Sequence, residues 1–339
     1  MDETAHPLVS VLTPVRNGAE FIEECVESVR RQTYTNWSYT IVDNCSDDGT
    51  PDIVDRLARS DSRIRVVRFE DAVGATENHN RALDQAEAES DFCKVVQADD
   101  WLYPECIELM TNCARASASI GVVGAYRLRD TAVDLAGLPY RTTVADGGVI
   151  LRQSLLGGPY VTGSPTATLL RTELVRRRDP FYDPSFWHSD TEALYWSFTQ
   201  ADFGFVHQVL TYSRRQPGAR STRADRVNTY APENLIFLLR YGPAALTPGE
   251  YRSRLRFELK RYVLWHARQS LKPSRLGESD FVEFHRDAAE RVARESGGDA
   301  TVRAAMTSVR LCLAPRRTRS ARRRGSPTLL DESKPRHAP

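Results

Sequence analysis

The sequence lacks the features of several common protein classes. No apolar run in its 339 residues approaches the roughly 20 residues of a membrane-spanning helix. Its six cysteines include no Cys-x-x-Cys pair, which argues against a zinc site and favours reduced thiols in a cytoplasmic protein. The 46 lysines and arginines are balanced by 45 acidic residues, so we expect no nucleic-acid partner.

The sequence also lacks the Gly-x-x-x-x-Gly-Lys loop of NTPases and the Gly-x-Gly-x-x-Gly turn of dinucleotide-binding proteins. Its first 126 residues alternate instead between the apolar patterns of β-strands and those of helices. The expected strands are 9–13, 38–42, 64–67, 92–97 and 120–126, and the expected helices are 21–31, 51–58, 76–88 and 106–113. This alternation predicts an α/β fold with a mostly parallel sheet and right-handed crossovers.

The most informative stretch is the strand 92–97, which is followed by two adjacent carboxylates, Asp99 and Asp100. Ligands of open α/β sheets bind outside the carboxyl ends of the strands. Two neighbouring carboxylates at such an end favour a hard divalent cation, Mg²⁺ or Mn²⁺, that bridges to substrate phosphates. The alternative is a helix N-cap followed by a first-turn acid, because Asp favours both positions.

The pattern changes beyond residue 126. Residues 127–160 are rich in loops, and a strand (166–170), an aromatic and acidic segment (181–190), a helix (191–199) and a strand (203–212) follow. Beyond residue 228 the pattern is helical, with helices at 232–239, 248–271, 279–295 and 301–313, and we identify no site chemistry there. We therefore divide the chain into residues 1–126, 127–225 and 226–314, with a disordered basic tail at 315–339.

The tail carries a cluster of arginines between Arg316 and Arg324. An exposed arginine cluster can make a weak contact with a membrane surface, which would place the protein peripherally at the inner face of the membrane. The alternative is a solvated tail without a partner.

Four segments in this order resemble glycosyltransferase family 2. They are Val-Ser-Val-Leu-Thr-Pro-Val-Arg-Asn-Gly at 9–18, Ile-Val-Asp-Asn-Cys-Ser-Asp-Asp-Gly-Thr at 41–50, residues 74–86 with Asn80, and Gln-Ala-Asp-Asp at 97–100, in the place of the family's Asp-x-Asp metal motif. The resemblance implies a GT-A fold, with 1–126 as its nucleotide-sugar-binding half and 127–225 as its acceptor-binding half. Residues 226–314 would then form a helical C-terminal subdomain.

The resemblance also implies roles in binding a nucleoside-diphosphate sugar, with a UDP- or dTDP-sugar favoured. The donor-binding positions are Thr13, Pro14, Arg16, Asp43, Asn44, His79 and Asp99. Asn44 stands where the family usually has an Asp that pairs with uracil, and its amide offers both an acceptor and a donor, so the choice of base stays open. His79 stands where many relatives have an Arg near the phosphates. Asp100, with Asp99 facing the ribose or a metal-bound water, would hold Mg²⁺ or Mn²⁺ against the diphosphate, and the metal would act as a Lewis acid.

The catalytic base of this family is commonly the Asp of a Glu-Asp pair before a helix, and here the matching place is Ser189-Asp190. The resemblance thus implies an inverting displacement with Asp190 as general base, and neighbouring aromatic residues can raise its pKa. The alternative is that Asp190 caps the helix, with His188 or Asp183 as rival bases. Trp187 and Tyr182 are candidate platforms for a sugar ring.

A last segment of the family, at the end of the second half, often carries a His that completes the metal shell. Gln216 takes that place here, and Arg214 or Arg215 is a candidate partner of the diphosphate.

The sequence therefore predicts a metal-dependent inverting glycosyltransferase that acts on a glycan, glycolipid or small-molecule acceptor. A catalytically silent nucleotide-sugar-binding protein of the same fold is the alternative, favoured by Asn44, Gln97 and Gln216, which depart from the family pattern. A nucleotidyltransferase is a third hypothesis, but the segment 14–18 is a poor match to the Gly-rich basic loop that it would need.

Overall fold

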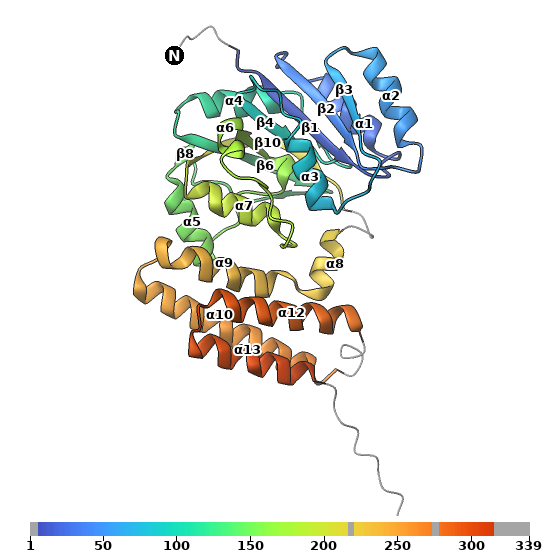
Figure 1. Ribbon diagram of the computed structural model, residues 1–339. Coiled ribbons are helices and arrows are strands. Elements are labelled where there is room, and N and C mark those ends of the chain that lie inside the picture. The colour runs from blue at the N-terminus through green and yellow to red at the C-terminus, as the bar shows by residue number, and fades with distance from the viewer. Residues whose placement is uncertain (1–5, 216–219, 273–277, 315–339) are drawn as a thin grey trace, which may run out of the picture.

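The computed structural model describes residues 6–215, 220–272 and 278–314 (Figure 1). Gln216 and the basic tail at 315–339 lie outside these residues, so the predictions made for them stay predictions.

Within the described residues, ten strands form one sheet in the order β3-β2-β1-β4-β9-β6-β10-β5, with β7 beside β6 and β8 beside β10. The strands are β1 (Val9–Val15), β2 (Trp37–Asp43), β3 (Ile64–Arg68), β4 (Phe92–Val95), β5 (Trp101–Leu102), β6 (Ile120–Arg129), β7 (Ala132–Asp134), β8 (Val144–Ala145), β9 (Thr168–Arg171) and β10 (Asp202–Ser213). Only β9 interrupts the central parallel order, because it pairs antiparallel with both β4 and β6. The mostly parallel α/β fold is confirmed, and β1, β2, β4, β6 and β10 end at one edge of the sheet.

Helices cover both faces of this sheet (Figure 1). They are α1 (Ile22–Arg30), α2 (Thr50–Ser60), α3 (Ala75–Leu83), α4 (Cys106–Arg115), α5 (Gly147–Leu155), α6 (Thr172–Arg176) and α7 (Ser189–Phe198). Side chains alternate between the faces as a strand requires: Val9, Val11 and Val15 pack with α1, α2 and α4, whereas Leu12 joins the core of the opposite face.

The C-terminal helices form a layer on that opposite side. After α8 (Arg220–Val227) come α9 (Tyr230–Ala245), α10 (Pro248–Gln269), α12 (Ser279–Glu295) and α13 (Ala300–Leu313). In Figure 1, α9 lies next to the sheet domain and α10 and α13 lie farther from it. One hydrophobic cluster runs from Leu12 of the sheet to Val309 of α13, so the helical layer shares its core with the sheet, and the domain boundaries stay a prediction. No helix among the described residues is long and apolar enough to cross a membrane.

Two parts of the sequence prediction need correction. The segment 127–160, predicted as loops, contains β7, β8 and helix α5, and helix α3 ends at Leu83 rather than at Ala88. Gly147, one of the glycines that suggested a loop, is required by close packing. A Cβ at this position would clash with the backbone carbonyls of Phe198 and Ala201. Helix α5 can therefore begin only with glycine at this position.

Candidate active site

A cavity of about 1100 Å³ lies between the carboxyl edge of the sheet and the helical layer. Asp99, Asp100 and Asp190, which are far apart in the sequence, all line it. Pro14, Arg16 and His79 also lie on the wall, as the sequence predicts.

The two adjacent carboxylates follow β4 and are held by the end of β10. Oδ2 of Asp100 accepts a hydrogen bond from Ser213 Oγ at 3.1 Å, and its Oδ1 accepts one from the backbone N–H of Arg214 at 3.1 Å. Burial, helped by the negative charge of Asp99, raises the pKa of Asp100 to about 7. Burial also raises the pKa of Asp99, against the opposing effect of the Arg214 guanidinium. This pair concentrates negative charge that a cation would stabilise.

Arg214 rather than Arg215 lies beside these carboxylates. Its Nε donates to the backbone carbonyl of Asp99 at 3.3 Å, and its Nη2 pairs with Glu24 at 2.6 Å. Arg215 instead faces Asp130 at 3.8 Å with its side chain 68% exposed. Arg16 is exposed on the cavity wall and has no ion pair among the described residues, so its charge is available to an anionic ligand.

Asp99 and Asp100 have the donor chemistry that Mg²⁺ or Mn²⁺ prefers, because carboxylate oxygens are hard ligands. Ser213, the Arg214 backbone and the Thr166 side chain donate hydrogen bonds to Asp100, and the remaining lone pairs of its two oxygens are available to a cation. The described residues hold no group of three His, Cys, Asp or Glu side chains suited to a metal ion. A cation here would therefore need phosphate oxygens and water to complete its shell, as Mg²⁺ commonly does.

Three side chains predicted to contact the donor do not line the cavity. Thr13 is fully buried and its hydroxyl lies 2.8 Å from the hydroxyl of Tyr39. Asn44 donates to the backbone carbonyl of Val73 at 2.8 Å and accepts from its N–H at 2.9 Å, so both ends of its amide are in use.

Asp43 is the third of these side chains. It accepts from the backbone N–H of Ser46 at 3.1 Å and faces Arg68 at 3.6 Å. Thr13 thus faces the core between β1 and β2, whereas Asp43 and Asn44 hold the loops that follow β2 and β3, and the side chains of these three residues do not line the cavity.

His79 points its ring at the cavity from the first turns of α3. Its Nδ1 lies 2.8 Å from the carbonyl of Ala75, and the ring meets Tyr182 edge-on with centroids 6.1 Å apart. Helix α3 also fixes the loop of Tyr182, because Asn80 donates to the Tyr182 carbonyl at 2.7 Å and accepts from its N–H at 2.9 Å.

Asp190 lies in the first turn of α7 and is not its cap, because the N-cap position is His188, two residues earlier. Its Oδ1 accepts from the backbone N–H of Thr191 at 2.8 Å. Burial, and after it the charge of Asp190, raises the pKa of Tyr160, Tyr182 and Tyr230, and all three residues line the cavity with Asp190.

The rival base His188 is engaged elsewhere. Its Nε2 lies 2.8 Å from Thr229 Oγ1, and its ring stacks on Tyr230 with centroids 3.5 Å apart.

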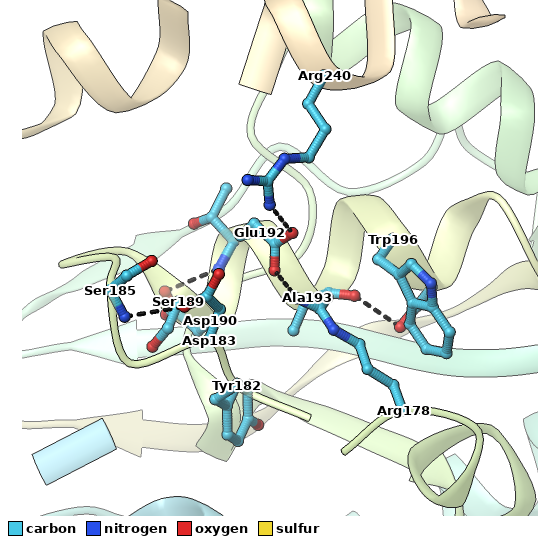
Figure 2. Close-up of polar contacts among 12 residues, drawn as sticks. Arg178, Tyr182, Asp183, Ser185, Ser189, Asp190, Glu192, Ala193, Trp196 and Arg240 are labelled. Carbon is cyan, nitrogen blue, oxygen red and sulfur yellow. Dashed lines mark hydrogen bonds and ion pairs between the residues drawn. The ribbon is translucent and has the colours of Figure 1, made fainter. Parts of the chain in front are cut away.

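Helix α9 holds the start of α7. Glu233, which is 2% exposed, accepts from the backbone N–H of Trp187 at 2.8 Å and of His188 at 2.9 Å. Two turns further along α9, Arg240 reaches Glu192 of α7 at 3.1 Å (Figure 2). Glu192 is also buried and pairs with Arg178 at 2.7 Å. The first turn of α7, with Asp190, is thus clamped between the sheet domain and the helical layer.

We identified no site chemistry in the helical segment from sequence, but the structure brings five of its residues to the cavity wall: Tyr230, Asn234, Leu238, Arg254 and Glu258. Arg254 and Glu258 pair at 2.6 Å, with Glu258 buried. The end of β6 adds Arg127, which pairs with Asp134 at 2.7 Å. One feature of the sequence could have indicated this part of the site. Glu233 and Glu258 interrupt otherwise apolar helix faces, and a buried charge needs a partner.

Comparison with known proteins identifies the class to which this site belongs. Residues 10–178 match the model of glycosyl transferase family 2, and the chain belongs to this family. TuaG of Bacillus subtilis (strain 168), named for teichuronic acid biosynthesis, is 42% identical over 94 residues, which cover 28% of this chain and 36% of TuaG. The matches to TuaG and to two further curated glycosyltransferases cover about a third of the length of each of those relatives.

Two solved structures share the fold over nearly the whole chain. TarS 1–349 of S. aureus, in complex with UDP-GlcNAc, has a TM-score of 0.63 at 19% identity and covers 91% of this chain and 90% of its own. The mannosyltransferase PcManGT of Pyrobaculum calidifontis, in complex with GDP-Man and Mn²⁺, has a TM-score of 0.54 at 17% identity and covers 91% and 87%. The predicted GT-A fold with a C-terminal helical region is confirmed.

Proposed function

We propose that this protein is a metal-dependent inverting glycosyltransferase that uses a nucleoside-diphosphate sugar. The observation that carries the proposal is that the Asp99–Asp100 pair and Asp190 line one cavity at the carboxyl edge of a GT-A sheet. Family membership supports it, as do the nucleotide sugars bound by TarS and PcManGT.

Asp99 and Asp100 would hold Mg²⁺ or Mn²⁺ at the diphosphate end of the cavity. When bound, such a cation acts as a Lewis acid that stabilises the leaving nucleoside diphosphate. Arg16, exposed on the wall, and Arg214, beside Asp99, add positive charge at the same end of the cavity. A UDP- or dTDP-sugar is the favoured donor, and Pro14 on the wall faces the nucleoside.

Asp190 removes the proton from the acceptor hydroxyl. The acceptor oxygen then forms a bond to the anomeric carbon while the bond from that carbon to the diphosphate oxygen breaks, so the configuration inverts. Tyr160, Tyr182 and Tyr230 line the same cavity as Asp190, and a carboxylate beside the acceptor hydroxyl is a suitable general base.

The acceptor occupies the part of the cavity that the helical layer completes. Trp187 and Tyr230 offer aromatic faces to sugar rings, and Asn234, Arg254 and Glu258 offer polar groups to hydroxyls. A carbohydrate or the sugar of a glycolipid fits this wall, and the name of TuaG supports a role in polysaccharide biosynthesis.

A thermal-shift screen tests the donor site. UDP, dTDP and GDP are each added with and without Mn²⁺, and a ligand at 100 times its Kd stabilises the folded state by about 2.7 kcal/mol. We expect one nucleotide to stabilise the protein only with metal, and Asp100→Asn to abolish that shift. Asp55→Asn, which removes an exposed carboxylate paired with Arg68 at 2.7 Å, is the matched control.

A turnover assay distinguishes an active glycosyltransferase from the alternative, a catalytically silent nucleotide-sugar-binding protein. The nucleotide sugar of the preferred base is incubated with carbohydrate acceptors, and release of nucleoside diphosphate is measured. Metal-dependent binding without release under any condition would favour the silent nucleotide-sugar-binding protein.

A further inference from the structure

Helix α10 carries large apolar side chains on the face opposite its buried side. Phe257 is 56% exposed, Leu264 is 48% exposed, and Leu271, just after the helix, is 70% exposed. They follow one another at intervals of seven residues, close to two helical turns, so they line up in one stripe. The buried side is formed by a separate set, Leu255, Glu258, Leu259, Tyr262 and His266. Exposed apolar side chains in such a row mark an interaction surface.

The same helix is strongly basic. Between residues 251 and 272 there are seven basic residues and one acidic residue, Glu258. The basic residues are Arg252, Arg254, Arg256, Lys260, Arg261, Arg268 and Lys272. Glu258 is buried and pairs with Arg254 and Arg261, each at 2.6 Å, so it contributes no negative charge to the outer face. The stripe is therefore an apolar row bordered by positive charge, of which Arg256, Lys260 and Arg268 have no ion pair among the described residues.

We propose that this outer face of α10 docks on a bilayer that contains anionic lipids. The apolar row would enter the boundary between headgroups and acyl chains, and the arginines and lysines would meet the anionic headgroups, which is how basic amphipathic helices bind membranes. A second copy of the chain is disfavoured, because a two-fold contact through this face would oppose two basic stripes. Nucleic acid would use the positive charge but would leave the row of Phe257, Leu264 and Leu271 without a partner.

The position of α10 in the fold agrees with this role. α10 and α13 lie on the side of the helical layer away from the sheet (Figure 1), and α13 exposes Leu311 at 71%. Arg254 and Glu258 of the cavity wall belong to the same helix, so the docked face lies within about one helix diameter, 10–12 Å, of the cavity.

Vesicle flotation with the full chain tests the proposal. Vesicles of phosphatidylglycerol and phosphatidylcholine are compared with vesicles of phosphatidylcholine alone, for the wild type and for the variant Phe257→Ser, Leu264→Ser, Leu271→Ser. The matched control Val133→Ser, Tyr140→Ser, Val149→Ser also removes three exposed apolar side chains, which lie outside α10 and the cavity wall. All three proteins keep residues 315–339, so any contribution of the tail is the same in each.

We expect the wild type and the control to bind the anionic vesicles within about twofold of each other, and the α10 variant to bind at least about tenfold more weakly. Lys260→Glu with Arg268→Glu should weaken binding by a similar or larger factor, since each charge near the surface changes the affinity about fivefold. In the reporter variant Phe257→Trp, brominated lipid should quench the added indole fluorescence.

Three results would overturn the proposal. Equal binding of the α10 variant and the wild type would assign membrane contact to another segment. Equal binding to neutral vesicles would remove the role of charge. A concentration-dependent dimer that the α10 variant loses would show that a second copy covers this face.

Discussion

Replacement of Glu233 by Gln tests whether the helical layer positions the catalytic base. The Glu233 carboxylate is buried and accepts two backbone hydrogen bonds, from Trp187 at 2.8 Å and from His188 at 2.9 Å. A hydrogen bond to a charged group contributes about 1.5–3 kcal/mol. The Gln oxygen can keep one of the two bonds, whereas its NH₂ group would oppose the other N–H. The variant should therefore lose about 2–4 kcal/mol of the interaction that fixes the start of α7.

This loss should appear in kcat rather than in donor binding. Asp190 lies two residues beyond His188, and a displacement of a reacting group by about 1 Å can reduce a rate about a hundredfold. We expect kcat to fall by about tenfold to a hundredfold. The affinity for nucleoside diphosphate with Mn²⁺ should stay within about twofold, because Glu233 does not lie on the cavity wall that holds Asp99 and Asp100.

Steady-state release of nucleoside diphosphate gives kcat, and calorimetric titration gives the nucleotide Kd. Glu295→Gln is the matched control, since it removes a carboxylate on the same layer that pairs with Arg240 at 2.7 Å and touches neither backbone N–H group. An unchanged kcat in a folded Glu233→Gln variant would refute the positioning role. A nucleotide Kd that rises in proportion to the loss of kcat would show a general structural defect. A wild type without turnover would refute the proposed function itself.

Three further changes probe the site and its support. Asp190→Asn should lower kcat by about 10²–10⁴-fold with nucleotide binding intact, and a loss of binding measured by calorimetry would make Asp190 structural. Asn44→Ala should cost about 1–3 kcal/mol in urea unfolding, because both backbone groups of Val73 lose their partner, and it should leave the preference among UDP, dTDP and GDP unchanged. Burial, with the nearby His285, lowers the pKa of His266 to about 3, so the unfolded chain binds a proton below pH about 6.5 that the folded chain does not. Stability should therefore fall as the pH drops from about 6.5 toward 3, and between pH 7 and 5 the wild type should lose about 2 kcal/mol more than His266→Leu in urea melts.

The donor half of the site could be predicted from sequence because its information is local. A buried strand is visible as an apolar run, and the carboxylates Asp99 and Asp100 follow that strand directly. Parallel strands end at the same edge, so polar residues after β1 and β4 must gather there. Asp190 was predicted differently, from the resemblance of Ser189-Asp190 to the family's Glu-Asp pair before a helix, and its role stays a prediction.

The direction of individual side chains at that edge depends on distant partners, which the sequence does not show. Asn44 follows β2 as expected, but its amide is used by Val73, which lies 29 residues away. Thr13 turns toward Tyr39, 26 residues away, across a parallel strand pair. A residue's place at a strand end can thus be predicted from its neighbours in sequence, whereas its partner is fixed only when the strands pair.

Helix α10 shows a related limit of prediction from sequence, and the way in which the structure packs this helix supports the membrane proposal. Its sequence contains two apolar stripes, one with Leu255, Leu259 and Tyr262 and the other with Phe257 and Leu264. Periodicity predicts the helix but does not say which stripe packs on the protein. The structure buries the first stripe and leaves the second exposed among basic residues. Contact with water is unfavourable for large apolar side chains, so the second stripe favours contact with a surface outside the described chain. The basic residues beside the stripe favour an anionic surface.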